Sequence, residues 1–162
     1  MKRLFILTTA LVIISIAGGI YFKDYYWKKY SFQGCGPNLS DYQYSIELPG
    51  QWNTKKRDLG SELLTKNSVY YDLTKNNMTF TISCTTQGVG GDICDTQYRK
   101  TFNVGNQIGE ACYGKINGIW KMGVLNLPRN LSNNTVIAFW AEDIEPDLLS
   151  KIFSTFQLNS KQ

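Results

Sequence analysis

An apolar run without a charged residue occupies Leu4 to Phe22, directly after Lys2 and Arg3. At about 1.5 Å per helical residue the run spans about 28 Å, close to the roughly 30 Å hydrocarbon core of a bilayer. Aromatic residues and lysines follow in the segment YYWKKY, a pattern typical of the membrane interface. The sequence therefore predicts an uncleaved transmembrane anchor at 4–22, after a short cytoplasmic start at 1–3.

A cleaved secretory signal is the alternative interpretation of this segment. Small residues before Gly18 fit a cleavage site near Ala17, and cleavage there releases a secreted protein. Positive charges on the two sides of the run are nearly balanced, so the charge bias does not decide the orientation. An even set of cysteines favours an oxidising compartment. We therefore expect a single-pass protein of the cytoplasmic membrane, with its N-terminus inside and its domain outside.

The four cysteines are Cys35, Cys84, Cys94 and Cys112. The spacing of Cys84 and Cys94 fits a disulfide across a loop, which leaves Cys35 and Cys112 as the second pair by default. Three connectivities are possible, and the sequence does not choose between them. The paired Cys-x-x-Cys spacing of a four-cysteine zinc site is absent. The cysteines are thus disulfide candidates, and we expect no metal and no cofactor.

Beyond the anchor, the chain has a size typical of one domain. We divide it into a stalk at 23–39, a single folded domain at 40–159 and a tail at 160–162. The whole chain has 17 Lys and Arg against 13 Asp and Glu, and without Lys2 and Arg3 the counts beyond the anchor are 15 against 13. This near balance argues against a nucleic-acid partner. The one tight basic cluster, Lys55 to Arg57, is interpreted as a solvated loop.

Strand patterns dominate the domain. Residues 42–48 alternate between apolar and polar, and residues 69–85 predict a hairpin around Lys75-Asn76-Asn77. The segment 108–127, interrupted by Asn117-Gly118, is also strand-like. Pro146 fits the first turn of a helix near the end of the chain. These patterns predict an α+β fold, an antiparallel β-sheet covered by helices.

Two motifs bracket the domain. The opening YQYSIELPGQW, Tyr42 to Trp52, is an aromatic strand followed by Pro and Trp, and the closing LLSKIFSTFQL, Leu148 to Leu158, is a helix followed by a Ser-Thr-Phe strand. In this arrangement the chain resembles the PsbP-like family, which includes the photosystem II extrinsic subunit and bacterial envelope relatives. The family's mid-domain Gly-Ala signature is faintly matched at Ile108 to Gly114. The resemblance implies an α/β/α sandwich around an antiparallel sheet, in a family whose members mostly bind partners without catalysis.

The chain contains no histidine. This excludes Ser-His-Asp and Cys-His nucleophile systems and removes the commonest zinc ligand. Two groups of carboxylates offer oxygens to a hard cation, but acidic residues are also favoured at a helix start, so we interpret them as structural. They are Asp92 and Asp95, and Glu142, Asp143, Glu145 and Asp147. We assign no catalytic residue and expect a protein that is not an enzyme.

Three tryptophans are candidates for a ligand-binding groove, with core packing as the main alternative. Trp140 lies in an apolar strand and is expected to be buried, whereas Trp120 stands beside Lys121 and is expected to be exposed. Trp52 follows the strand that ends at Pro49. We name Trp52 and Trp120 as the candidate binding-surface aromatics.

Together these features predict a membrane-anchored, extracytoplasmic binding or assembly-support module without catalysis. Its partners are the membrane, through the N-terminal helix, and an envelope protein or small ligand on one face of the sheet. A carboxylate-based envelope hydrolase is one alternative, favoured if two acidic side chains meet in a deep cleft with perturbed pKa values. A structural envelope subunit is another, favoured by a large exposed apolar patch without a pocket.

Overall fold

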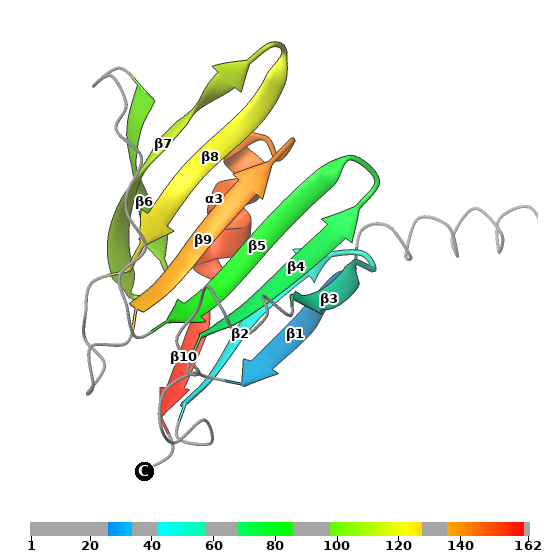
Figure 1. Cartoon of the computed structure of the whole chain (residues 1–162), viewed down its shortest axis with the longest axis vertical. Helices are drawn as coiled ribbons and strands as arrows, with labels where there is room; N and C mark the ends of the chain where they lie inside the picture. Colours follow the sequence, from blue (N-terminus) through cyan, green and yellow to red (C-terminus); the bar gives the residue numbers. More distant parts are fainter. Residues whose placement is uncertain (1–25, 34–41, 58–67, 86–97, 128–135, 161–162) are drawn as a thin grey trace, which may run out of the picture.

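The computed structural model describes residues 26–33, 42–57, 68–85, 98–127 and 136–160. Within these ranges the chain forms ten strands and one helix (Figure 1). In chain order they are β1 (Trp27–Gln33), β2 (Tyr42–Pro49), β3 (Asn53–Arg57), β4 (Val69–Lys75), β5 (Met78–Thr85), β6 (Arg99–Val104), β7 (Gln107–Ile116), β8 (Ile119–Asn126), β9 (Val136–Glu142), α3 (Pro146–Ser154) and β10 (Gln157–Ser160).

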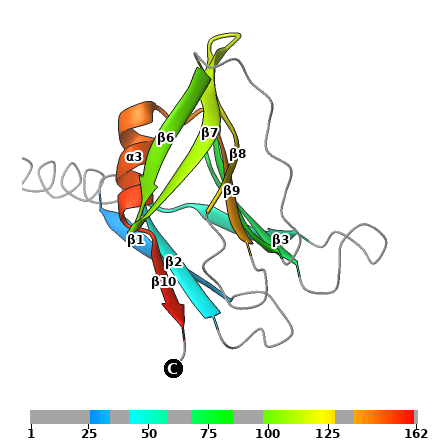
Figure 2. The same ribbon diagram turned by 90° about the vertical axis from the view of Figure 1, so that its left-hand side faces the viewer.

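The strands form two antiparallel sheets. One has three strands in the order β1-β2-β10, and the other has seven in the order β3-β4-β5-β9-β8-β7-β6. Figure 2 shows that α3 and the three-stranded sheet lie on the same side of the seven-stranded sheet. We call the face of the seven-stranded sheet toward α3 the inner face and the opposite face the outer face.

The hydrophobic core fills the space between the inner face and α3. Phe153 of α3 is fully buried, and the centroid of its ring lies 5.9 Å from that of Phe80, 5.4 Å from Phe102 and 5.3 Å from Phe139. These three rings belong to β5, β6 and β9, so the side chain of Phe153 packs against three strands of the sheet at once. Pro146 occupies the first turn of α3, which confirms the predicted start of this helix.

Side chains alternate strictly along β5. Since Phe80 contacts α3, the residues in phase with it point to the inner face, and the intervening residues point to the outer face. The outer-face residues of β5 all carry hydroxyl groups, namely Thr79, Thr81, Ser83 and Thr85. The outer face of the sheet is therefore polar at its centre.

Two predicted turns are confirmed. Asn76 lies between β4 and β5 with φ of 53°, and Asn117 and Gly118 join β7 to β8 with φ of 51° and 84°. Asparagine and glycine tolerate positive φ better than other residues, which explains why the hairpins turn at these positions.

The predicted α+β fold with helices covering a sheet is wrong. In the part of the chain that the structure describes, strands dominate, the single helix has nine residues and no layer of helices covers either sheet. The α/β/α sandwich implied by the PsbP-like resemblance is therefore not found. The inner face is instead covered by the three-stranded sheet together with α3 (Figure 2).

Two segments that the sequence analysis left outside regular structure are strands. Trp27–Gln33, placed in the stalk, forms β1 and pairs along its whole length with β2. The basic cluster Lys55 to Arg57 forms most of β3, an edge strand of the seven-stranded sheet. Charged side chains on an edge strand discourage pairing with another chain, which explains in structural terms why basic residues are clustered on this strand.

The prediction of a single-pass membrane protein is corrected by the helices of the structure. Over the described ranges, none is long and apolar enough to cross a bilayer. We therefore do not retain the location in the cytoplasmic membrane with its inside-to-outside orientation, whereas the membrane as a partner stays a prediction. The segment Leu4 to Phe22, on which the prediction depended, lies outside the described residues.

Two of the four cysteines are described. Cys84 lies on β5 and Cys112 on β7, and neither is a free thiol because both are disulfide-bonded. They are not bonded to each other, since β9 and β8 stand between their strands and adjacent strands lie about 4.8 Å apart. Among the described residues there is thus no disulfide between two cysteines, and the connectivity Cys84–Cys112 is excluded. Cys35 and Cys94 lie outside the described residues.

Candidate functional site

A groove of about 350 Å³ lies on the outer face of the seven-stranded sheet. Residues from five strands line it, so segments far apart in the sequence meet there. They are Arg57 of β3, Tyr70 of β4, Thr79 and Thr81 of β5, Lys121 and Met122 of β8, and Trp140, Ala141 and Glu142 of β9. We call this set the groove.

An aromatic platform forms the middle of the groove. The rings of Tyr70 and Trp140 have centroids 6.0 Å apart and planes inclined by 30°. Tyr70 pairs in register with Ser83 and Trp140 with Thr81, so the two aromatic side chains flank β5 from opposite sides. Both are partly exposed. The two rings therefore leave part of an apolar surface open to solvent beside the hydroxyl groups of β5.

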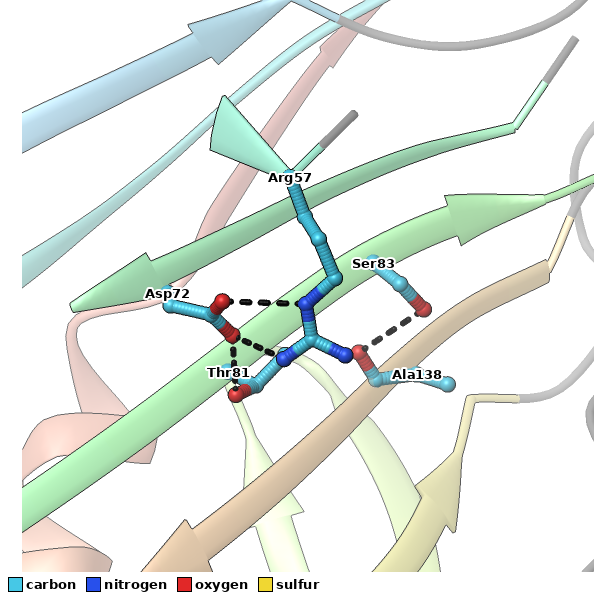
Figure 3. A network of polar contacts seen from close by, with 5 residues as sticks. All are labelled: Arg57, Asp72, Thr81, Ser83 and Ala138. Carbon is cyan, nitrogen blue, oxygen red and sulfur yellow. Dashed lines mark hydrogen bonds and ion pairs between the residues drawn. The ribbon is translucent and has the colours of Figure 1, made fainter. Parts of the chain in front are cut away.

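An ion pair closes one side of the groove (Figure 3). Arg57 reaches across the outer face from β3 and donates from Nε to Oδ2 of Asp72 at 3.0 Å and from Nη2 to Oδ1. Thr81 donates its hydroxyl to the same Oδ1 at 2.8 Å. The guanidinium carbon also lies 5.9 Å from the centroid of Tyr70. The Arg57 guanidinium is thus fixed beside the aromatic platform by a bidentate pair.

The pair has opposite effects on the pKa values of its two members. Partial burial alone raises the pKa of Asp72, but hydrogen bonds from Arg57 and Thr81 and the positive charge of Arg57 outweigh burial, so the pKa lies below its ordinary value. The hydrogen bond to Asp72 raises the pKa of Arg57. Both groups are therefore charged at neutral pH.

A second ion pair stands on the other side of the platform. Nζ of Lys121 lies 3.0 Å from Oε1 of Glu142, and the two residues face each other in register on β8 and β9. Both side chains are about half exposed. The register of β8 against β9 shifts between Met122 and Leu125, which inserts one extra residue into β8 beside the groove wall.

The outer face is closed beyond one end of the groove and open at the other. Ser83 and Ala138 are fully buried, and the Ser83 hydroxyl lies 3.5 Å from the Ala138 carbonyl oxygen (Figure 3). Toward the opposite end, Thr79 is partly exposed and Glu142 is exposed. The groove is therefore accessible to solvent on the side of Thr79 and Glu142.

The structure places the predicted aromatic residues differently from the sequence analysis. Trp52 is only 3% exposed, and its Nε1 donates to the Pro49 carbonyl at 3.0 Å, so little of it can meet a ligand. Trp120 stacks on Tyr113 with 5.2 Å between ring centroids. Neighbouring side chains of a strand point to opposite faces, and Lys121 lines the groove, so Trp120 points away from the groove. Trp140, expected in the core, is the tryptophan of the groove.

The carboxylates named from the sequence do not gather into a metal centre in the described part of the chain. No group of three or more His, Cys, Asp and Glu side chains there is placed to hold a metal ion. Of the named residues, only Glu142 lines the groove. Asp92 and Asp95 lie outside the described residues.

Comparison with known proteins adds no assignment. No family model, curated protein or solved structure matches the chain. The PsbP-like relationship therefore stays a prediction from two sequence motifs.

Proposed function

We propose that the protein is a non-catalytic binding module whose small-molecule ligand occupies the groove. The observation that carries the proposal is the partly exposed pair Tyr70 and Trp140, which lies between two ion pairs on a polar sheet face. Ligand sites combine apolar ring surfaces with a few fixed polar groups, and this groove has both. Its volume of about 350 Å³ falls in the range of about 300–1,000 Å³ usual for small-molecule sites.

The charges beside the groove favour binding over hydrolysis. A carboxyl that acts as a general acid near neutral pH needs a raised pKa. The pKa of Asp72 is lowered instead, and its two oxygens already accept hydrogen bonds from Arg57 and Thr81. Glu142 is half exposed and paired with Lys121. The two ion pairs therefore support recognition of a ligand without turnover.

A ligand screen on the full chain tests the proposal. We would record saturation-transfer NMR spectra of a mixed library of neutral, anionic and cationic fragments with the wild type, Y70A and W140A. The matched control is Y26A, because Tyr26 is also an aromatic residue, 45% exposed, but does not line the groove. We expect fragments that bind the wild type and Y26A but lose binding in Y70A and W140A. Fragments that bind all four proteins equally would show that the groove is not the ligand site.

A further inference from the structure

The two rings of the aromatic platform are too close together to clamp a ligand between them. The ring centroids of Tyr70 and Trp140 lie 6.0 Å apart with planes inclined by 30°, whereas a flat base between two rings needs about 3.5 Å on each side. A ligand of the platform therefore packs on the exposed parts of the two rings. Sugar rings present faces of C–H groups that pack on aromatic rings, and successive sugars can use successive rings.

Each cation of the groove has a carboxylate partner, in the groove or directly beside it. Arg57 is paired with Asp72, and Lys121 with Glu142. An anionic ligand would have to compete with two carboxylates for the same cations, and a cationic ligand with Arg57 and Lys121 for the carboxylates. Separating a close ion pair leaves an uncompensated charge, which costs free energy. A neutral ligand leaves both pairs intact.

The same pairs supply hydrogen-bonding groups of both kinds. Nη1 of Arg57 makes no hydrogen bond to any described residue, and Nζ of Lys121 has donors left after its contact with Glu142. The second carboxylate oxygen of Glu142 and the hydroxyl of Thr79 can accept hydrogen bonds from a ligand at the open end. Hydroxyl groups of a sugar both donate and accept, so they match a rim that alternates donors and acceptors.

The position of the groove argues against an extended peptide. Peptides that bind sheets usually add to an edge through backbone hydrogen bonds. The aromatic platform of the groove instead lies over β4, β5 and β9, whose backbones are paired with neighbouring strands on both sides. Recognition there depends on side chains alone.

We infer that the ligand of the groove is a neutral oligosaccharide, whose sugar rings stack on Tyr70 and Trp140 and whose hydroxyls bridge to the Arg57–Asp72 and Lys121–Glu142 pairs. This inference rests on the proposed function and names the ligand class for the same site.

The test is a titration of the full chain with defined sugars. The probes fall into three classes. The neutral sugars are cellotriose, chitotriose, maltotriose and mannotriose. The anionic probes are trigalacturonic acid and adenosine monophosphate, and the third class is a short neutral peptide. Binding is followed by calorimetry with the wild type, W140A, W140F and Y26A. We expect at least one neutral trisaccharide to bind, W140A to weaken it by about tenfold, and W140F to restore most of the affinity because a ring is kept.

Salt dependence separates a neutral ligand from a charged one. The affinity for the neutral trisaccharide is expected to stay within about twofold between about 0.05 M and 0.5 M salt, since no net charge is exchanged. Binding of only the anionic probes or the peptide through Trp140 would overturn the inference but leave the groove as a ligand site. If fragments bind at Trp140 but no sugar binds, the oligosaccharide inference is also overturned, and the groove again remains a ligand site. If nothing binds at Trp140, both the inference and the proposed function fail.

Discussion

Tyr70 and Trp140 lie side by side on the outer face of the seven-stranded sheet, with ring centroids 6.0 Å apart, although they come from strands separated by β5. Their positions follow from register, because Tyr70 stands beside Ser83 and Trp140 beside Thr81. A shift of either strand by one residue would turn its aromatic side chain into the core. The groove therefore depends on the registers of β4 and β9 against β5.

The Arg57–Asp72 pair is expected to contribute modestly to stability and to do so in a pH-dependent way. D72N should lower the free energy of unfolding at pH 7 by about 1 kcal/mol, since the guanidinium is partly exposed. The folded pKa of Asp72 lies below its unfolded value of about 3.9, so this contribution is present above about pH 4 and is lost as the pH falls through the folded pKa. Urea unfolding of wild type and D72N from pH 2 to pH 7 measures the difference.

The matched control for D72N is E142Q, which alters the half-exposed pair with Lys121. It should change the free energy of unfolding by less than about 0.5 kcal/mol. If D72N is as stable as the wild type at pH 7, the pair does not contribute as described.

Phe153 is expected to be the most costly core position of α3. F153A should destabilise the fold by about 3–5 kcal/mol, because the ring is fully buried against Phe80, Phe102 and Phe139. L148A, on the same helix but only partly buried, should cost clearly less. Chemical denaturation of both variants checks this, and equal losses would show that α3 is not anchored by Phe153.

Gly105 and Gly118 both have positive φ, 59° and 84°, but differ in their surroundings. A Cβ at Gly105 would lie 2.5 Å from the carbonyl oxygen of Phe156, whereas a Cβ at Gly118 would meet nothing within 4 Å. Both alanine variants strain the backbone, by about 1–2 kcal/mol, and G105A must also move the chain near Phe156. Thermal unfolding should therefore show a larger loss for G105A. A loss at least as large for G118A would contradict the close packing of Gly105.

Tyr113 should make stability fall at alkaline pH. Burial and then the negative charge of Glu145 raise the pKa of Tyr113 to about 12, and its hydroxyl donates to the Ile144 carbonyl at 2.7 Å. The folded pKa lies above the unfolded value of about 10, so the contribution is complete below pH 10 and is lost as the pH rises through about 12. Y113F should be less stable at pH 8 by about 1 kcal/mol and lose less between pH 10 and 12. Parallel losses in both proteins would contradict this assignment.

Local patterns in the sequence predicted several elements correctly. The hairpin around Asn76, the turn at Asn117-Gly118 and the start of α3 at Pro146 are each set by residues close together in the chain. The arrangement of the sheets was not predictable in the same way. One helix pattern near the end of the chain indicated a helical layer, but the single α3 shares the inner face with a second sheet.

The groove was harder to predict than the strands that carry it. Trp140 lies in the apolar run VIAFWA, where both faces of the strand are apolar and alternation cannot show which side chain points outward. The alternation along β5 shows more clearly which side chains point outward, since Thr79, Thr81 and Ser83 all lie on one polar face of the strand. Only the pairing of β5 with β4 and β9 shows that Tyr70 and Trp140 stand beside those hydroxyls.

The central claim is that the groove is the ligand site. It is tested most directly by the NMR signals of the indole N–H groups of the four tryptophans. The Trp140 signal is assigned by its loss in W140F, and the full chain is then titrated with the fragment library and the neutral trisaccharides. We predict that the Trp140 signal shifts on saturation while that of Trp52, which is only 3% exposed, stays in place. An unchanged Trp140 signal under conditions where a ligand saturates the protein would contradict the claim.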